Sequence, residues 1–296
     1  MSGQPNLHSL YISPLEKCNL QCQMCYTRKA PVQLSGDQIL DFVERFRASR
    51  LLELVTFCGG EVFLLDWFCD LVNELCQKGL MVEIITNGTI DCLDELTTPS
   101  LVNLIVSLDG LKEKHEQNRG HGSFDKTWQF ILKAVKLGFH LEIFTVVSQH
   151  NYDHLSEFEQ WLEEELGWMP RVTYHPRKPS TYLAAHPVDN LQGSVEELGF
   201  LTQQQLEQLY KEKRVFPPRQ LGCHQLSLMA DGQIYACCEG TRPIGKISDK
   251  VYDLVERYLD LLEDSPCCPE PNFMCGMGEF LHERKCKGKS KNEKKE

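Results

Sequence analysis

Residues 54–61 read Leu-Val-Thr-Phe-Cys-Gly-Gly-Glu, a short apolar run that ends in two glycines and a carboxylate. The same design recurs at residues 82–88, Val-Glu-Ile-Ile-Thr-Asn-Gly, and at residues 104–110, Leu-Ile-Val-Ser-Leu-Asp-Gly. Short apolar runs bounded by Gly, Asn or Asp are typical of buried strands. In parallel α/β folds, the residues that follow such strands form the binding edge of the sheet. The polar ends of these three runs are therefore candidates for one functional site.

Helical patterns separate the apolar runs, and Ser35 with Gln38 forms a capping-box pattern at the start of one of them. The expected strands are residues 10–12, 54–57, 82–85, 104–107, 140–147 and 171–174, and the expected helices begin after Ser35 and span about 64–78, 91–96, 124–137 and 154–166. Strands that alternate with helices predict right-handed parallel βαβ units. Five or six units are too few for a closed barrel of about 250 residues. We therefore expect an α/β fold that is either a partial barrel or an open doubly wound sheet.

Composition excludes several classes of protein. The chain has 296 residues, 42% of them hydrophobic, which suffices for a sizeable core. Its formal net charge of −11 disfavours nucleic acid and anionic membranes as partners. No apolar run is long enough for a transmembrane helix, and residues 1–10 lack the pattern of a secretory signal, so a cytoplasmic protein is expected.

The fourteen cysteines fall into two groups, seven between Cys18 and Cys92 and seven between Cys223 and Cys286. Without a secretory signal, this usage indicates metal or redox chemistry rather than disulfides. Within the first group, Cys18, Cys22 and Cys25 form a C-x3-C-x2-C triplet directly after the first expected strand. Thiolates favour iron–sulfur clusters, zinc or copper(I), and a zinc site would usually have a fourth Cys or His nearby, which is missing. The other cysteines of this group show no ligand spacing, and packing is the expected role of Cys69 and Cys76.

Together with Tyr26, the triplet resembles the signature of the radical S-adenosylmethionine (radical SAM) superfamily. Further segments match that family in order and spacing: Gly59-Gly60-Glu61, Thr86-Asn87-Gly88, Ser107-Leu108-Asp109-Gly110, and Arg119-Gly120 with Gly122-Ser123-Phe124. Val62 departs from the proline that many members carry. The resemblance spans residues 7–174 and implies a partial (βα)6 barrel of the radical SAM type.

The resemblance also implies cofactors and their ligands. Cys18, Cys22 and Cys25 would hold three irons of a [4Fe–4S] cluster, and the fourth iron would chelate the amino nitrogen and carboxylate of S-adenosyl-L-methionine (AdoMet). The cofactor-binding residues that it implies are Tyr26, Gly59, Gly60, Glu61, Asn87, Ser107, Asp109, Arg119 and Val147. Among these, Arg119 would pair with the AdoMet carboxylate, and Val147 with Val146 would pack on adenine. Asn87, Ser107 and Asp109 would reach the ribose hydroxyls or the methionine part.

Residues 223–286 form a second unit. Asp231-Gly232 between apolar runs predicts a hairpin that brings Cys223 and Cys237 together. Their spacing resembles the SPASM and twitch extensions of radical SAM enzymes, which bind auxiliary iron–sulfur clusters, although Glu279 stands where one cysteine of that pattern falls. One auxiliary [4Fe–4S] cluster is the first choice, held by Cys223 and Cys237 with two further ligands from Cys267, Cys268, Cys275 and Cys286. Two clusters, or a structural zinc site, are the alternatives.

The predicted domains are thus the partial barrel at 7–175, a connection at 176–222, the small cysteine-rich module at 223–286 and a disordered charged tail at 287–296. The implied activity is reductive cleavage of AdoMet to a 5′-deoxyadenosyl radical that abstracts hydrogen from a substrate, which would make the chain an oxidoreductase or maturase. A peptide side chain is the favoured substrate, with a flavodoxin or ferredoxin-type electron donor. The alternatives are oxidation of a small molecule such as an alcohol, and a non-catalytic iron–sulfur carrier. Cys238 and Glu239 are speculative acid–base residues.

Overall fold

The computed structural model describes residues 7–177, 198–215, 225–238 and 242–264. Nine strands form one sheet in the order β6-β5-β4-β3-β2-β1-β7-β8-β9. Their bounds are β1 Ser9–Ile12, β2 Leu54–Phe57, β3 Met81–Thr86, β4 Val102–Ser107, β5 His140–Val147, β6 Arg171–Pro176, β7 Gln225–Leu228, β8 Gln233–Tyr235 and β9 Pro243–Lys246. The pairings from β1 to β6 are all parallel. The α/β fold with a parallel sheet is therefore confirmed.

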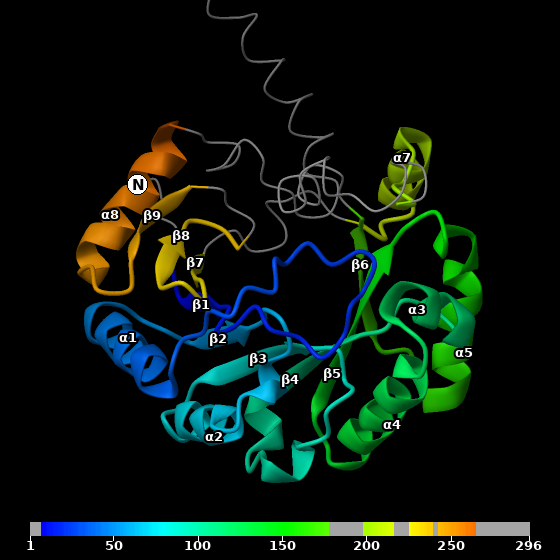
Figure 1. Cartoon of the computed structure of the whole chain (residues 1–296), viewed down its shortest axis with the longest axis horizontal. Coiled ribbons are helices and arrows are strands. Elements are labelled where there is room, and N and C mark those ends of the chain that lie inside the picture. The colour runs from blue at the N-terminus through cyan, green and yellow to red at the C-terminus, as the bar shows by residue number, and fades with distance from the viewer. Residues whose placement is uncertain (1–6, 178–197, 216–224, 239–241, 265–296) are drawn as a thin grey trace, which may run out of the picture.

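The sheet is curved, and helices cover its convex side (Figure 1). The helices are α1 Gly36–Ser49, α2 Phe68–Gln77, α3 Lys112–Arg119, α4 Ser123–Lys136, α5 Leu155–Leu166, α7 Gln203–Lys211 and α8 Val251–Asp264. Single 3-10 turns occupy Val62–Leu64, Leu93–Glu95, Pro99–Leu101 and Tyr152–His154. This arrangement corresponds to a partial barrel rather than a flat, doubly wound sheet, because the described helices between β1 and β6 lie along one side of the curve.

The two faces of the sheet differ in chemistry. Alternate residues of each strand point to opposite faces. On the helix side, residues such as Ile84, Leu104 and Ile143 are completely buried in the main hydrophobic core. On the inner side, Glu83 accepts hydrogen bonds from Thr56 and Asn103. The inner face is therefore partly polar, and the apolar core lies between sheet and helices.

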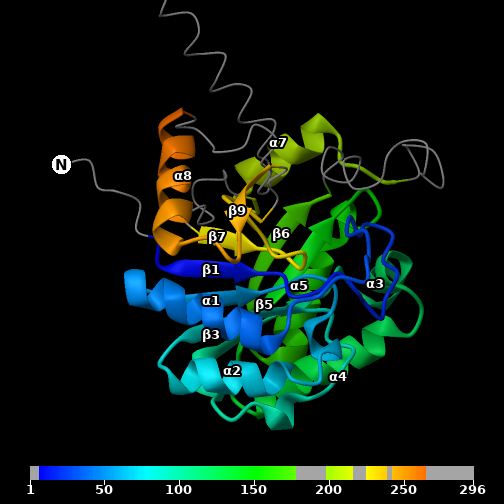
Figure 2. The ribbon, with the colours of Figure 1, turned by 60° about the vertical axis from the view of Figure 1, so that its left-hand side comes forward.

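The end of the described chain extends the same sheet. β7 pairs with β1 in parallel, and β7, β8 and β9 then pair antiparallel. The hairpin predicted at Asp231-Gly232 is confirmed, with Gly232 at a φ of +78° and its N–H bonded to the Met229 carbonyl. Figure 2 shows α8 beside α1, where Arg45 donates to the carbonyl oxygens of Ile247 and Asp249. This unit therefore packs directly on the barrel.

Element boundaries agree with the sequence in most places. The capping box is present, since the Gln38 N–H donates to Ser35 Oγ at 3.2 Å and the Ser35 N–H donates to Gln38 Oε1 at 2.9 Å. Helix α2 begins at Phe68 rather than Leu64, because a 3-10 turn precedes it. Helix α3 was not predicted. The predicted tail at 287–296 lies outside the described residues.

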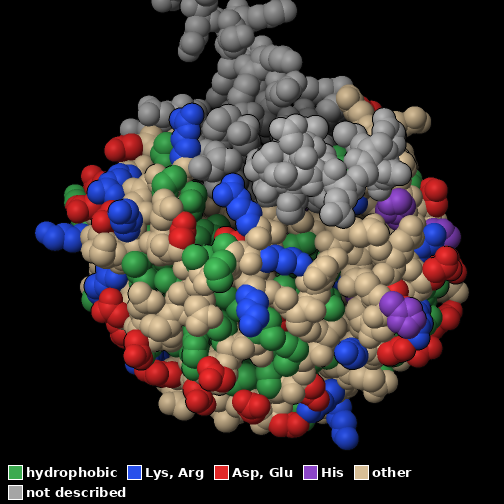
Figure 3. Space-filling model, in the orientation of Figure 1, with side chains coloured by type: hydrophobic (Ala, Val, Ile, Leu, Met, Phe, Trp, Pro, Cys, Tyr) green, Lys and Arg blue, Asp and Glu red, His purple; other side chains and the backbone are tan. Residues whose placement is uncertain are grey.

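The surface carries both signs of charge. In Figure 3, Asp and Glu side chains crowd the lower rim of the molecule, and several Lys and Arg side chains stand nearer the middle of the same face. Within the described ranges, no helix is both long and apolar enough to cross a lipid bilayer.

Candidate functional site

The cysteine triplet lies on the long loop between β1 and α1. Cys18, Cys22 and Cys25 are each partly exposed. The loop is held from two sides, since the Gln23 N–H donates to the Asn118 carbonyl at 2.9 Å and Arg177 Nη2 donates to the Gln23 carbonyl at 2.7 Å. The three thiols therefore stand on a segment that other parts of the chain fix in place.

The glycine turn after β2 packs directly against this loop. The Gly60 N–H donates to the Leu15 carbonyl at 2.9 Å, and the Glu61 N–H donates to the Lys17 carbonyl at 3.0 Å. A Cβ on Gly59 would lie 2.4 Å from the Leu15 oxygen, and one on Gly60 would lie 1.9 Å from the Lys17 oxygen. Side chains are excluded at both positions because the two backbones approach so closely.

Glu61 joins the glycine turn to the end of β3. Its carboxylate is fully buried and accepts from Thr86 Oγ1 at 2.8 Å, from the Asn87 N–H at 2.8 Å and from the Phe63 N–H at 3.3 Å. Burial raises the pKa of Glu61, while these hydrogen bonds act in the opposite direction. Glu61 therefore links the turn that follows β2 to the end of β3.

Asn87 completes the connection to the cysteines. Its side-chain N–H2 donates to Cys18 Sγ at 3.7 Å and to Asn19 Oδ1 at 2.9 Å. Its side-chain oxygen accepts from the N–H and the hydroxyl of Thr89. The strand-end residues that the sequence singled out after β2 and β3 thus converge on the cysteine loop.

Asp109 and Arg119 form a buried ion pair beside this cluster of motifs. Arg119 Nε donates to Asp109 Oδ2 at 2.7 Å, and Nη2 donates to Oδ1 at 3.1 Å. The Val146 N–H donates to Oδ1 as well, at 2.9 Å. Asp109 is 0% exposed and Arg119 is 8% exposed. In this structure each residue pairs with the other, and a direct contact of either with AdoMet stays a prediction.

The remaining predicted cofactor residues differ in their surroundings. Ser107 at the end of β4 is buried, and Tyr26 beside the cysteine triplet is 44% exposed. Val147 was predicted to pack on adenine, and that contact stays a prediction. Val147 is fully buried in a cluster with Leu155 of α5, Tyr174 of β6, Leu209 and Val215, on the outer side of the sheet. Strand alternation places its neighbour Val146 on the inner side instead.

The cysteine loop suits an iron–sulfur cluster in the chemistry of its donors. Burial raises the pKa of Cys22 to about 11, although the nearby Arg119 lowers it. Burial likewise raises the pKa of Cys18. Thiols in this state become ligands when a metal displaces their protons. Among the described residues, no three Cys, His, Asp or Glu side chains converge as one bare metal ion would require. Cysteine thiolates are the usual ligands of iron–sulfur clusters, so the donors present fit that group.

A second group of titratable side chains was not predicted as a group. The side chains of Tyr11 of β1 and Cys58, which follows β2, influence the pKa values of each other. Burial raises the pKa of Cys58 to about 11, and Cys238 beyond β8 adds to this rise. The speculative residue Cys238 is therefore near Cys58, the residue that precedes the glycine turn. Parallel pairing of β7 with β1 brings these segments together, and no local sequence signal marks it.

Most of the predicted auxiliary ligands cannot be placed. Cys237 is 3% exposed and follows β8. Cys223, Glu239, Cys267, Cys268, Cys275 and Cys286 lie outside the described residues. The SPASM or twitch character of this unit therefore remains a prediction.

The curved parallel sheet and the joined motifs at its carboxyl edge define an α/β protein with a cysteine-bearing loop at its ligand-binding end. The family model of the radical SAM superfamily matches residues 12–162. The chain belongs to the radical SAM superfamily, whose members are enzymes, and homologues in the family bind a [4Fe–4S] cluster and AdoMet.

Two curated relatives illustrate the range of the family. The sporulation killing factor maturation protein SkfB of Bacillus subtilis is 27% identical over 148 residues, which are 47% of this chain and 36% of that protein. The GTP 3′,8-cyclase of Clostridium botulinum is 27% identical over 165 residues, 51% of each protein. The chain thus matches about a third to a half of the length of these relatives.

Solved structures share the fold. The protein anSMEcpe, with bound AdoMet and a Cp18Cys peptide, has a TM-score of 0.68 at 18% identity, and the match covers 94% of both chains. SuiB of Streptococcus suis, bound to the precursor peptide SuiA, has a TM-score of 0.63 at 14% identity over 89% of this chain and 66% of SuiB.

Proposed function

We propose that this chain is a radical SAM maturase that removes a hydrogen atom from a peptide side chain, in an oxidation or a cross-linking reaction. The observation that carries the enzymatic part is the joining of motifs at one edge of the sheet. The cysteine loop, the Gly59–Glu61 turn and Asn87 are linked by hydrogen bonds between strands far apart in sequence. A chain that only carried electrons would need the cysteines but not the glycine turn and Asn87 bonded to them.

Each motif has a physical task in this proposal. Cys18, Cys22 and Cys25 hold the cluster, which, with AdoMet bound, supplies an electron and a 5′-deoxyadenosyl radical. Gly59 and Gly60 leave room for the methionine part beside the backbone. Asn87 orients the first cysteine. Arg119, already fixed by Asp109, presents a buried positive charge near Cys22.

Two groups of relatives support a peptide substrate. The name of SkfB describes maturation of a killing factor, and SuiB and anSMEcpe were solved with peptides bound. A flavodoxin or ferredoxin-type protein is the proposed electron donor. The GTP 3′,8-cyclase favours the second candidate, a small-molecule substrate.

The C-terminal unit is proposed to hold one auxiliary [4Fe–4S] cluster with Cys223 and Cys237 among its ligands. Iron analysis tests this directly in the variant in which Cys18, Cys22 and Cys25 are all Ala. About four irons per chain after anaerobic reconstitution support one auxiliary cluster. About eight irons mean two such clusters, and an absence of iron overturns the proposal.

The enzymatic proposal is tested by the product of AdoMet cleavage. Reconstituted protein, with dithionite and AdoMet under anaerobic conditions, is expected to form 5′-deoxyadenosine. The triple Ala variant is expected to form none, and Cys76→Ser, a buried cysteine of α2, should form as much as the parent. Equal product from the parent and the triple variant would reject the proposal.

The substrate class is tested separately with deuterium-labelled probes. Transfer of deuterium into 5′-deoxyadenosine from the side chains of the Cp18Cys peptide, or of a mixture of Cys- and Ser-containing peptides, supports a maturase. Transfer from GTP or a simple alcohol, with none from the peptides, favours the small-molecule alternative.

A further inference from the structure

Two cysteines outside the candidate site lie against each other. Cys69 stands at the beginning of α2, and Cys92 stands in the loop between β3 and the turn at Leu93–Glu95. The Cys69 thiol donates to the Cys92 carbonyl oxygen at 3.9 Å, which places the two cysteines side by side. The sequence predicted packing alone for Cys69, because 22 residues separate it from Cys92 and no ligand motif joins them.

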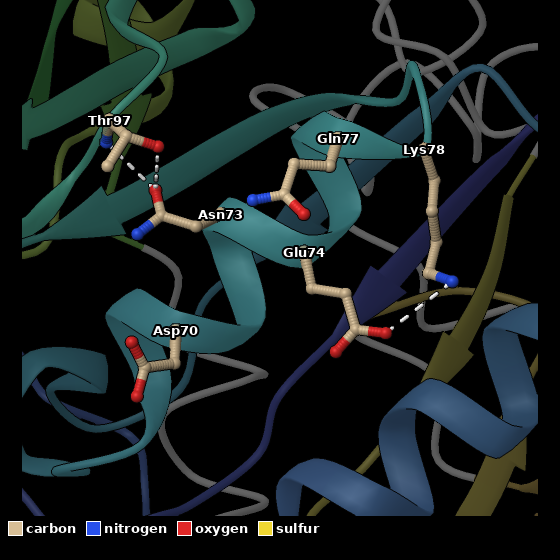
Figure 4. Close-up of a pocket in the computed structure, with 6 residues that line it drawn as sticks. All are labelled: Asp70, Asn73, Glu74, Gln77, Lys78 and Thr97. Atoms are coloured by element: carbon tan, nitrogen blue, oxygen red, sulfur yellow. Dashed lines mark hydrogen bonds and ion pairs between the residues drawn. The ribbon is translucent and has the colours of Figure 1, made fainter.

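The surrounding contacts hold these two segments together. One turn further along α2, Asn73 Nδ2 donates to the Glu95 carbonyl at 2.8 Å. Asn73 Oδ1 accepts from the Thr97 N–H at 2.9 Å and from the Thr97 hydroxyl at 3.1 Å, as Figure 4 shows. Because Asn73 makes three hydrogen bonds to the loop, the two thiols meet at an interface that is already in place.

The two thiols also differ in a way that favours reaction between them. The neighbouring Cys92 side chain lowers the pKa of Cys69, against the effect of burial, and the Cys69 side chain raises the pKa of Cys92. Cys69 is 6% exposed, whereas Cys92 is partly exposed and open to a small oxidant. One thiol of the pair therefore has a lowered pKa, and the other can be reached from solvent.

We propose that Cys69 and Cys92 are an oxidisable dithiol, which hydrogen peroxide converts to a disulfide between α2 and the loop after β3. Peroxide oxidises one thiol to a sulfenic acid with release of one water. The sulfur of the second thiol then displaces the hydroxyl, loses its proton and releases a second water. Two thiols are oxidised by two electrons, and one peroxide is reduced to two waters.

The disulfide would connect two segments that serve the candidate site. Helix α2 follows the Gly59–Glu61 turn, and the loop follows Asn87. These segments already meet through Glu61, so the disulfide would add a covalent link outside the site and leave the site's own contacts in place. This modification is independent of the proposed function, because neither cysteine belongs to the cysteine triplet.

Peptide mapping tests the proposal in the whole reconstituted protein. The protein is treated with one equivalent of hydrogen peroxide, its free thiols are alkylated, and it is cut before aspartate. This cleavage separates Cys69 in the peptide 66–69 from Cys76, and places Cys92 in the peptide 91–93. The expected product is the 66–69 peptide linked to the 91–93 peptide, in most chains, and dithiothreitol should release both.

Variants make the assignment specific. Cys92→Ser and Cys69→Ser should lose the linked peptide completely. Cys76→Ser should keep it, since Cys76 lies seven residues further along the same helix and is buried. The proposal is overturned if Cys69 and Cys92 are both recovered alkylated after peroxide, if either is recovered only as sulfinic acid, or if Cys69 is found linked to another cysteine.

Discussion

The side-chain amide of Asn87 donates to the sulfur of Cys18 across 3.7 Å, so that the end of β3 contacts the first cysteine of the loop after β1. Glu61 fixes Asn87 through its backbone N–H, and Gly60 and Glu61 bond to the base of the cysteine loop. The site is therefore one hydrogen-bonded unit, and a change in any part of it should reach the others. The following predictions rest on this unit.

Glu61→Gln should lower the free energy of unfolding by about 1–3 kcal/mol. The carboxylate accepts three hydrogen bonds, and a glutamine would turn N–H groups toward at least one of these donors. Urea unfolding of the protein without cluster measures the loss. Glu53→Gln, at an exposed position just before β2, should change stability too little to detect.

Gly60→Ala should abolish retention of the cluster at the cysteine triplet. The added methyl group would lie 1.9 Å from the Lys17 oxygen, so the base of the cysteine loop must move. Iron bound at the triplet after reconstitution is the measurement. Gly138→Ala is the matched control, because nothing lies within 4 Å of its Cβ and its φ of +79° costs about 1–2 kcal/mol. Equal loss of iron in both variants would contradict the role given to Gly60.

Asp109→Asn should destabilise the chain by about 3–5 kcal/mol, because it leaves the buried Arg119 guanidinium without its carboxylate. Chemical unfolding of the apo-protein gives this value. The exposed pair of Lys112 and Asp125 provides the comparison, and Asp125→Asn should leave stability unchanged. Similar effects at the two sites would mean that burial of the Asp109 pair has no energetic consequence.

His115 should make the stability of the chain depend on pH. Burial lowers its pKa to about 4, from 6.5, with Arg119 acting in the same direction and Asp109 against it. The unfolded chain then binds the proton more readily than the folded chain, so stability falls as the pH drops below 6.5. The loss amounts to about 2 kcal/mol between pH 7 and pH 5. His115→Gln keeps an acceptor for the Asp109 N–H but cannot bind a proton in this pH range. The free energy of unfolding of this variant, measured at pH 7 and at pH 5, should therefore lack the loss that His115 causes.

Much of the barrel follows from the sequence because its strands carry a strong local pattern. The runs at 54–57, 82–85 and 104–107 are apolar and end in glycine or aspartate turns, and each is a strand of the sheet. Helix α3 was not predicted, because Lys112–Arg119 is polar throughout and lacks apolar residues at helical spacing. It forms where His115, Asn118 and Arg119 are buried by tertiary contacts.

At the site too, prediction from the sequence failed where the structure depends on tertiary packing. The motif residues could be placed at one edge, because the carboxyl ends of parallel strands meet there. Their partners could not be predicted. The Asp109–Arg119 pair and the Cys69–Cys92 contact depend on how separate elements pack. The face of the sheet on which Val147 lies could not be predicted either. Alternate residues of β5 point to opposite faces, so a shift of one residue along the strand reverses the direction of the side chain.

The central claim is that the unit formed by the cysteine loop, the glycine turn and Asn87 binds a cluster together with AdoMet. Electron paramagnetic resonance of the dithionite-reduced protein, recorded with and without AdoMet, tests it most directly. We predict a [4Fe–4S] signal that changes when AdoMet is added, and the loss of that change when Cys18, Cys22 and Cys25 are replaced by Ala. A signal that AdoMet leaves unaltered, or one that responds equally in the triple variant, would contradict the account.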